Sequence, residues 1–139
     1  YQASQAGVKI KMIVRGICCL VPGIKGLSEN ITVISVVDKF LEHPRVLIFE
    51  NAGEKKIYLS SADFMTRNIE NRVEVACPVY DDELQRQILD TFELSWKDNI
   101  KARVVNQNPQ NKMVIPQSGQ ATQRSQWTTY AYFKNKLKP

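Results

Sequence analysis

The first half of the chain alternates short apolar runs with polar turns, a pattern typical of β-strands. Runs dense in Val and Ile predict five strands, at residues 9–14, 31–37, 46–50, 56–60 and 73–78. The first two and the last are nearly continuous in apolar residues, which predicts strands covered on both faces. The polar stretch NAGE at 51–54 predicts a hairpin-type turn between the third strand and the fourth.

The second half of the chain predicts a helix over 82–99, because large apolar residues recur there at every fourth position. The stripe consists of Leu84, Ile88, Phe92 and Trp96. Acidic residues at 81–83 complement the positive end of the helix dipole, and Lys97 and Lys101 lie near its negative end. An aromatic stripe at this spacing is expected to face the core.

The two ends of the chain also carry helix signals. The opening residues YQASQAG predict the last turns of a helix that Gly7 closes. Since the chain starts inside that helix and without an initiating Met, we expect it to be part of a longer protein. Residues 106–124 are polar and rich in Gln and Asn, which predicts a long loop. A terminal helix follows at 125–137, and we expect it to turn four residues toward the body: Trp127, Tyr130, Ala131 and Leu137.

Strands mixed with flanking helices favour an α/β sandwich, and 139 residues are enough for one domain with its own core. The composition, 43% apolar and 24% charged, is that of a globular protein, and no apolar run is long enough to cross a bilayer. Cys18, Cys19 and Cys77 show neither disulfide nor zinc spacing, so we expect a reducing compartment and buried thiols. The net charge of +5 favours anionic partners only weakly, because the basic residues are spread along the sequence.

His43, the single histidine, opens the stretch that holds the candidate chemistry, HPRVLIFENAGEKKIYLSSAD at 43–63. Arg45, Glu50 and an SSAD turn at 60–63 follow it, an order that resembles a degenerate phospholipase D signature. That signature is His-x-Lys-x-x-x-x-Asp followed by Gly-Ser-x-Asn, and here Arg, Glu, Ser and Asp replace Lys, Asp, Gly and Asn. Because side chains alternate along a strand, Arg45 is expected on the face that His43 uses, where a cation and an imidazole could meet one phosphoryl group.

Each of these residues also has a structural explanation. An ion pair between Arg45 and Glu50 on adjoining strands is a simpler interpretation than direct catalysis. The serines and the aspartate of the SSAD turn could bind phosphate, but capping of a short helix that begins near Phe64 is their commoner use. The glycine-bearing stretch at 22–30 lacks the Lys-Ser/Thr ending of a P-loop, which excludes Walker-type nucleotide binding.

Four stretches together resemble the C-terminal catalytic domain of bacterial polyphosphate kinase, the ATP:polyphosphate phosphotransferase. They are IVRGICCLVPGIKGLSENI at 13–31, FLEHPR at 40–45, SSADFMTRN at 60–68 and NRVEVACPV at 71–79. The resemblance is collinear over roughly residues 1–105 and is more specific than any single motif. It implies an α/β, phospholipase D-like half-domain with a mixed β-sheet flanked by helices. Residues 1–139 would form this single C-terminal domain of a longer enzyme.

The resemblance also implies roles for four basic residues. In the family, the Arg of the Val-Arg-Gly turn, here Arg15, and the His of the Leu-Glu-His turn, here His43, contact the nucleotide phosphates. Arg72 of the Arg-Val-Glu strand and Arg67 of the Met-x-Arg-Asn turn fit the same phosphate-rich tunnel. The histidine that becomes phosphorylated belongs to the half that precedes this one.

One imidazole cannot act in a single step both as the nucleophile and as the stabiliser of the departing oxygen. We therefore expect His43 to be catalytic in the second role, with Arg15 and Arg72 as electrostatic clamps. The structural alternative for His43 is a hydrogen bond to a backbone carbonyl.

The implied activity is the reversible transfer of the terminal phosphate of ATP to polyphosphate through the phosphohistidine of the preceding half. The chain by itself is therefore expected to be inactive. Its implied partners are ATP or ADP, inorganic polyphosphate and the preceding catalytic half-domain, with no nucleic acid. Mg²⁺ accompanies the ATP, with its ligands outside this chain. We expect the full-length protein to be a homo-oligomer, either in the cytoplasm or associated with a membrane.

Two other classes of function stay open. Half of a phospholipase D-type phosphodiesterase would share the fold, but such an enzyme normally needs the lysine that Arg45 replaces. A noncatalytic polyanion-binding module would hold nucleic acid or polyphosphate through its basic residues. Binding by such a module would survive the loss of Arg15 and His43 and would weaken steeply with salt.

Overall fold

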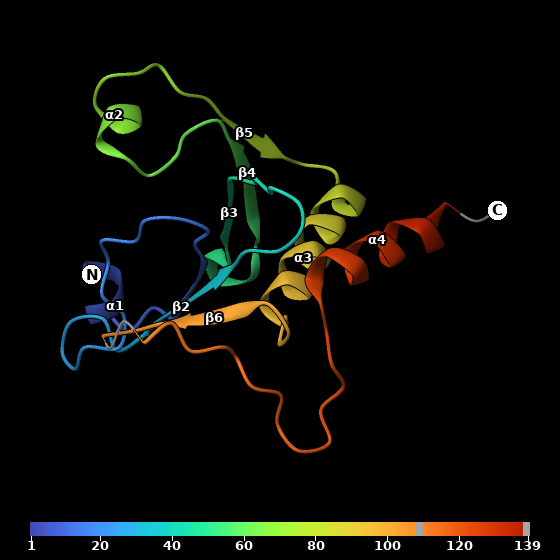
Figure 1. The fold of residues 1–139 in the computed structure, drawn as a ribbon. Helices are drawn as coiled ribbons and strands as arrows, with labels where there is room; N and C mark the ends of the chain where they lie inside the picture. Colours follow the sequence, from blue (N-terminus) through green and yellow to red (C-terminus); the bar gives the residue numbers. More distant parts are fainter. Residues whose placement is uncertain (108–109, 138–139) are drawn as a thin grey trace. The chain divides into compact units, whose positions relative to one another are not determined.

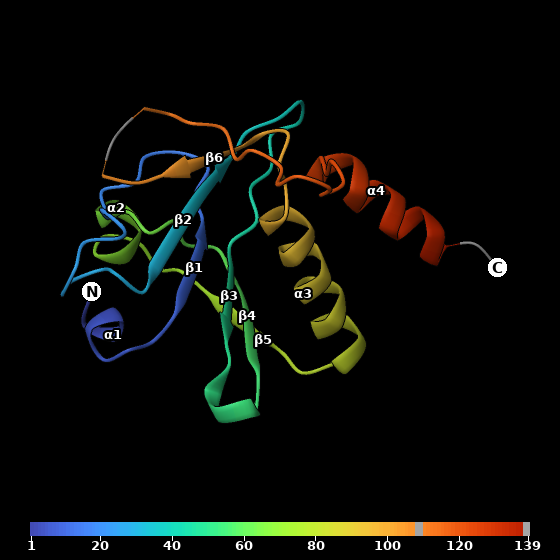
Figure 2. The same ribbon diagram turned by 90° about the horizontal axis from the view of Figure 1, so that it is seen from below.

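The structure is a computed structural model that describes residues 1–107 and 110–137. Within these residues, the strands form two three-stranded sheets (Figure 1, Figure 2). The chain divides into two compact units. The first comprises Tyr1–Leu41 and the described residues from Thr91 onward, and the second comprises Glu42–Asp90. The predicted α/β class is confirmed, with the strands divided between two sheets.

The first unit contains a mixed sheet in the order β1-β2-β6. Its strands are β1 (Ile10–Ile13), β2 (Ile31–Val36) and β6 (Ala102–Val105). β1 runs parallel to β2, with Ile10 opposite Ile31, whereas β6 runs antiparallel to it, with Val33 opposite Val105. The parallel pair brings the carboxyl ends of β1 and β2 to the same edge of the sheet.

The core of the first unit is built around β2, its central strand. Ile34 and Val36 form a buried cluster with Ala102 of β6. Three partly buried side chains pack against this cluster: Ile13, Trp96 and Val114. Four of the six residues of β2 are buried, which agrees with the apolar run predicted there, although Thr32 is exposed and leaves part of one face open to solvent.

Asp98 is a buried carboxylate that joins three segments of the first unit. It is 1% exposed and lies two residues after α3 (Asp82–Trp96). Its Oδ1 accepts hydrogen bonds from the backbone N–H groups of residues 100–102 at 3.0, 2.6 and 3.0 Å. Its Oδ2 accepts one from Ser125, the first residue of α4 (Ser125–Lys136), at 2.7 Å. Burial alone would raise the pKa of Asp98, but the combined backbone hydrogen bonds outweigh it and hold that pKa below its usual value.

Polar contacts attach α4 to the first unit. Arg124, just before α4, donates from Nε and Nη2 to both carboxylate oxygens of Asp38, at 2.7 and 2.6 Å. The Gln126 side chain accepts from the Phe40 N–H at 3.1 Å and donates to the Phe40 carbonyl at 2.8 Å. The buried residues of α4 are Ser125 and Gln126. The residues predicted to face the body were wrong, since all four of them are exposed: Trp127, Tyr130, Ala131 and Leu137.

The second unit contains an antiparallel sheet in the order β3-β4-β5. Its strands are β3 (Val46–Phe49), β4 (Lys56–Ser60) and β5 (Ala76–Val79). The short 3-10 helix η1 (Asn51–Gly53) connects β3 to β4 where a hairpin-type turn was predicted. Ile57, in the central strand, is 1% exposed, and α2 (Thr66–Ile69) lies in the connection between β4 and β5.

The five predicted strands are all present, and the differences have local causes. The last one starts at Ala76 rather than at 73 and is mostly exposed, so the expectation of two covered faces was wrong there. Val73 precedes that strand and is 99% exposed. β6 was not predicted, because four residues directly after the polar end of α3 are too short to show a period. Gly7 closes α1 (Gln2–Gln5) with a φ of 87°, as predicted.

The predicted central helix is confirmed as α3, although its apolar stripe is less buried than expected. Leu84 is 51% exposed, and the remaining three stripe residues are half-buried, with Phe92 and Trp96 stacked at 6.2 Å between ring centroids. Asp81 begins the helix by accepting the Leu84 N–H on its Oδ1 at 2.8 Å. The stripe therefore contributes to the core mainly at its carboxyl end, where Trp96 meets the β2 cluster.

The three cysteines and the polar segment at 106–124 differ from or extend what the sequence predicted. Cys18 is half-buried and Cys19 and Cys77 are exposed, all three as free thiols, so the expected burial was wrong. In the predicted loop at 106–124, positions 108–109 lie outside the described residues, and the described part forms a single β-bridge, between Met113 and Arg103. None of the helices in the described ranges has the length and apolarity that a membrane span requires.

We predict that Asp98→Ala lowers the free energy of unfolding by ~3 kcal/mol or more, because it leaves four backbone N–H groups without their acceptor in a buried place. Asp98→Asn keeps one acceptor oxygen and should lower it by about half as much. Urea unfolding at pH 7, followed by tryptophan fluorescence, measures both values. Equal losses for the two variants would contradict this account of Asp98.

Candidate phosphate-binding site

One edge of the β3-β4-β5 sheet gathers most of the residues that the sequence singled out. Because β4 is antiparallel to both neighbours, its end lies beside the starts of β3 and β5. The pairing continues past the strands, since Ser60 N–H donates to the Arg45 carbonyl at 2.8 Å and Ser61 N–H donates to the Val75 carbonyl at 2.9 Å. The SSAD turn therefore leaves the sheet between the two flanking segments.

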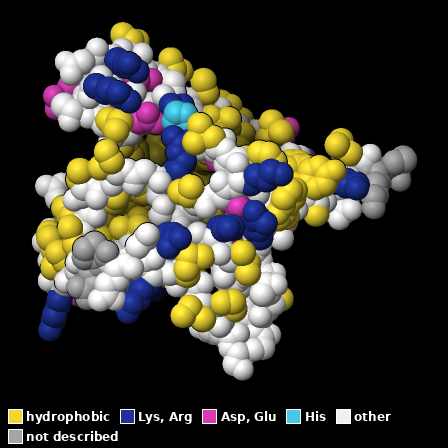
Figure 3. Space-filling model, in the orientation of Figure 1, with side chains coloured by type: hydrophobic (Ala, Val, Ile, Leu, Met, Phe, Trp, Pro, Cys, Tyr) yellow, Lys and Arg dark blue, Asp and Glu magenta, His cyan; other side chains and the backbone are white. Residues whose placement is uncertain are grey.

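Asp63 is the meeting point of His43 and Arg45. Its Oδ1 lies 2.8 Å from Arg45 Nε and 3.1 Å from His43 Nε2. The hydrogen bond from Arg45, followed by that from His43, lowers the pKa of Asp63 from 3.8 to about 2. The expectation that Arg45 and His43 lie on the same side is confirmed, with the Asp63 carboxylate between them. Figure 3 shows the histidine, in cyan, at the surface.

Two structural interpretations of this stretch were wrong. Arg45 does not pair with Glu50, because Glu50 lies at the opposite end of β3 and contacts Lys55 at 3.0 Å. The SSAD turn does not cap a helix at Phe64. Helix α2 begins at Thr66 with no side-chain cap. The polar groups of the turn instead bind the segments around them.

In the part of the chain that the structure describes, His43 does not form the hydrogen bond to a backbone carbonyl that was its structural alternative. Its Nε2 contacts the carboxylate of Asp63, and its side chain is 47% exposed. Pro44 separates His43 from Arg45, whose backbone extends the β3–β4 pairing. The ring is therefore attached to the sheet edge on one side and open to solvent on the other.

Glu74 forms a second carboxylate centre at the same edge. It accepts hydrogen bonds from the Ser61 hydroxyl and, at 2.7 Å, from Asn68 Nδ2. These two bonds, in that order, lower the pKa of Glu74 despite the opposing effect of burial, and the charge of Arg72 adds to them. Ser61 Oγ also accepts the Val75 N–H at 3.0 Å. Glu74 thus ties the SSAD turn to α2 and to the start of β5.

Sequence reasoning missed Glu74 and Asn68 as members of this network. The available signal for Glu74 was its position two residues after Arg72 in an extended segment, where alternation places both on one face. Asn68 carried no signal, because its role depends on the buried position that α2 gives it, with 3% exposure. Networks of this kind arise from tertiary contacts that a local pattern does not encode.

The predicted arginines occupy different parts of the fold. Arg67 lies in the last turn of α2, and Arg72 lies ahead of β5. Both side chains are exposed, and among the described residues neither forms an ion pair. Arg15 belongs to the first unit, where it follows the carboxyl end of β1 and is exposed. The structure thus holds His43, Arg67 and Arg72 in one unit and Arg15 in the other.

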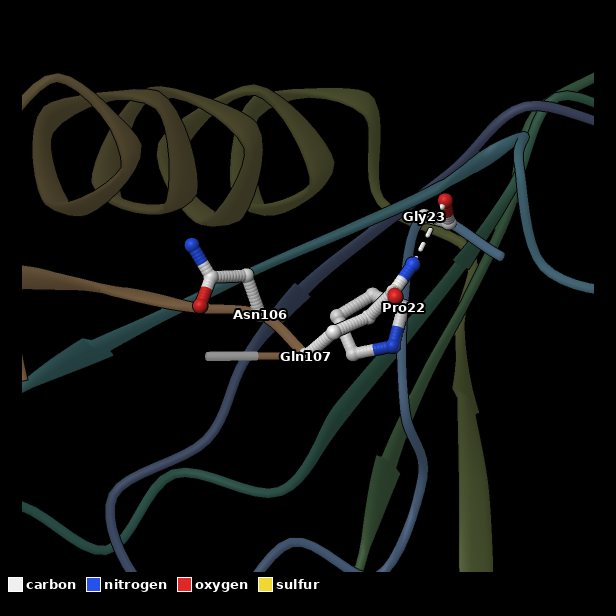
Figure 4. A pocket seen from close by; sticks show the side chains of 4 residues that line it. All are labelled: Pro22, Gly23, Asn106 and Gln107. Carbon is white, nitrogen blue, oxygen red and sulfur yellow. Dashed lines mark hydrogen bonds between the residues drawn. The ribbon is translucent and has the colours of Figure 1, made fainter. Parts of the chain in front are cut away.

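A pocket of about 270 Å³ lies elsewhere, in the first unit (Figure 4). Pro22, Gly23, Asn106 and Gln107 line it, and Gln107 Nε2 donates to the Gly23 carbonyl at 3.1 Å. None of these four side chains ionises, so this pocket offers no charge to a phosphate group. The described ranges also contain no cluster of three or more His, Cys, Asp or Glu side chains arranged to hold a metal ion.

Guanidinium groups and an imidazole at an exposed sheet edge suit oxyanions, because they offer several N–H donors and positive charge. An α/β protein with such an edge has the features of a phosphate-handling domain. A model of the family described as polyphosphate kinase C-terminal domain 2 matches residues 1–126. The chain belongs to this family, which confirms the resemblance found in its sequence.

Individual relatives agree with the family assignment. The chain is 53% identical over 135 residues to a polyphosphate kinase of Vibrio parahaemolyticus, covering 97% of this chain and 19% of that protein. It is 46% identical over all 139 residues to the polyphosphate kinase of Escherichia coli K12, covering 20% of it. The crystal structure of polyphosphate kinase from Porphyromonas gingivalis superimposes with a TM-score of 0.93 at 46% identity, over 97% of this chain and 20% of that one. The chain therefore spans about a fifth of the length of these relatives.

We predict an acid-dependent contribution of Asp63 to stability. Its pKa is about 2 in the folded state and near 3.8 when unfolded, so its contribution is complete above pH 3.8 and disappears as the pH falls through 2. Asp63→Asn should therefore be less stable than the parent chain at pH 7 and should approach it toward pH 2. Urea titrations across this range measure the difference.

Arg45→Gln is the matched variant, because it keeps the carboxylate and removes the main cause of its low pKa. It should shift the acid loss of stability upward, toward pH 3.8. A constant difference between Asp63→Asn and the parent chain at every pH would contradict the prediction.

Proposed function

We propose that this chain is the C-terminal domain of a polyphosphate kinase that reversibly transfers the terminal phosphate of ATP to polyphosphate. The phosphohistidine is carried by a preceding domain of the same enzyme. The observation that carries the proposal is the joint attachment of the single histidine and of Arg45 to Asp63, in a chain that belongs to the polyphosphate kinase family. This sheet edge presents an imidazole and guanidinium groups to solvent.

The chemistry needs such groups. A phosphoryl group in transfer spreads negative charge over its oxygens, and catalysis is mostly positioning and electrostatic stabilisation. Arg15 and His43 contact the nucleotide phosphates, and Arg72 and Arg67 line the same phosphate-rich tunnel. Mg²⁺, when bound with ATP, neutralises part of the charge on the nucleotide, and its ligands lie outside this chain.

The transfer proceeds in two steps, first from ATP to the histidine and then from the histidine to polyphosphate. A nitrogen of the histidine in the preceding domain attacks the terminal phosphorus, the bond to the bridging oxygen breaks, and ADP leaves. A terminal oxygen of polyphosphate then attacks the phosphorus, and the histidine nitrogen leaves. His43 stabilises the departing oxygen of the first step by donating a hydrogen bond, while Arg15 and Arg72 act as electrostatic clamps.

The chain by itself should not turn over ATP, since it contains one histidine and that residue has the stabilising role. We expect no ADP release and no polyphosphate synthesis when it is incubated with Mg-ATP. A coupled assay for ADP and a dye assay for polyphosphate measure the two products. Sustained turnover by the chain alone would overturn this assignment of roles.

A chimera tests the site in an active enzyme. In the polyphosphate kinase of Vibrio parahaemolyticus, this chain replaces the segment that aligns with it. Because the two are 53% identical over 135 residues, the other 47% of the aligned residues change. His43→Gln should lower kcat for polyphosphate synthesis by about 10²-fold or more, and Arg15→Ala should raise KM for ATP and lower kcat.

Arg86→Ala is the control for the arginine variants, because this exposed side chain lies on α3, where it forms an ion pair with Glu83 at 3.6 Å. It should leave kcat and KM unchanged. Full activity in both the His43 and Arg15 variants, together with polyphosphate binding that salt abolishes, would favour a noncatalytic polyanion-binding module.

A further inference from the structure

The contacts of Asp63 determine which nitrogen of the His43 ring carries a proton. Its Oδ1 faces His43 Nε2 at 3.1 Å and Arg45 Nε at 2.8 Å. At neutral pH an ionised carboxylate can only accept hydrogen bonds. The proton in the contact with His43 is therefore on Nε2, which selects one tautomer of the neutral ring.

Arg45 gives this contact a rigid support. Its backbone continues the β3–β4 pairing through the bond from Ser60 N–H, and its guanidinium holds Asp63 from the same side. The side chains of Arg45 and Asp63 are 27% and 29% exposed, against 47% for His43. The carboxylate is thus held more firmly than the ring that it contacts.

We propose that Asp63 is a positioning residue that holds the His43 ring by Nε2–H and leaves Nδ1 as the nitrogen that takes up a proton and then donates a hydrogen bond to the phosphate group. The role of His43 toward phosphate rests on the proposed function, whereas the orientation and tautomer of its ring rest on the contacts alone. Asp63 acts through His43 and does not itself touch the substrate, since a carboxylate beside a phosphate would repel it. Arg45 keeps Asp63 ionised and in place.

The first test uses the chain itself and does not depend on the proposed function. Because the chain has one histidine, its side-chain ¹⁵N signals belong to His43 without assignment. In the parent chain, with the ring neutral, we expect the shift pattern of a ring protonated on Nε2 and bare on Nδ1. Asp63→Asn, which is isosteric and uncharged, should move both ¹⁵N shifts toward a tautomer mixture, and Asp63→Glu should restore most of the parent pattern. Identical spectra for the parent and Asp63→Asn overturn the proposal.

The second test uses the chimera and a double-mutant cycle. Asp63→Asn should lower kcat by about 10- to 100-fold with a smaller change in KM, the scale on which orienting partners act. In the His43→Gln background the same substitution should change kcat by less than about 2-fold, because Asp63 then has no ring to position. Asp82→Ala, at an exposed carboxylate that begins α3, is the control and should leave both backgrounds unchanged.

The outcomes separate the two proposals. If His43→Gln retains full activity, the proposed role of His43 is wrong, while the ¹⁵N result still decides the positioning. If His43→Gln is impaired but Asp63→Asn reduces kcat equally in both backgrounds, the positioning proposal is wrong and the role of His43 stands. Circular dichroism of each variant verifies folding, and Asp63→Glu supplies a carboxylate variant if Asp63→Asn unfolds.

Discussion

The pairing of β4 with a strand on each side is the constraint on which the site depends. A central antiparallel strand brings its own end beside the starts of both neighbours, so three segments distant in the chain meet at one edge. The meeting places Arg45, Ser61 and Glu74 at the same end of the sheet without any of them lying in the interior. The buried part of the unit, centred on Ile57, serves mainly to keep this register.

The charges at this edge are arranged in two centres with different balance. Asp63 accepts hydrogen bonds from two donors, Arg45 and His43, and the charge of Arg45 balances its own. Glu74 is satisfied by the neutral groups of Ser61 and Asn68, so its charge remains beside Arg72. Structural carboxylates therefore orient the site, and exposed arginines provide its attraction for anions.

The sequence was sufficient for the elements and for part of the site. Apolar runs and their periodicity located five strands and α3, although β5 and the start of α3 are more exposed than these patterns predicted. The order of His43, Arg45 and the SSAD turn correctly indicated that these residues meet, since strand alternation and the hairpin bring them together. The partner of Arg45 was misassigned, because an ion pair with Glu50 was expected across adjoining strands, whereas these two residues lie at opposite ends of β3 and the contact of Arg45 is with Asp63. Asp98 and Asn68 were not singled out from the sequence, because the contact of Asp98 with Ser125 N–H and that of Asn68 with Glu74 depend on how separate elements come together.

The polar attachment of α4 has a thermal consequence. Ion pairing of Arg124 with Asp38 and the twin bonds of Gln126 to Phe40 fix the start of this helix by directional contacts. Apolar contacts lose strength in the cold, because hydrophobic stabilisation weakens on cooling, whereas these contacts contain little apolar area. The polar part of this attachment is therefore less sensitive to cold than the ring contact of Phe40 with Trp127, at 6.3 Å between centroids, that lies beside it.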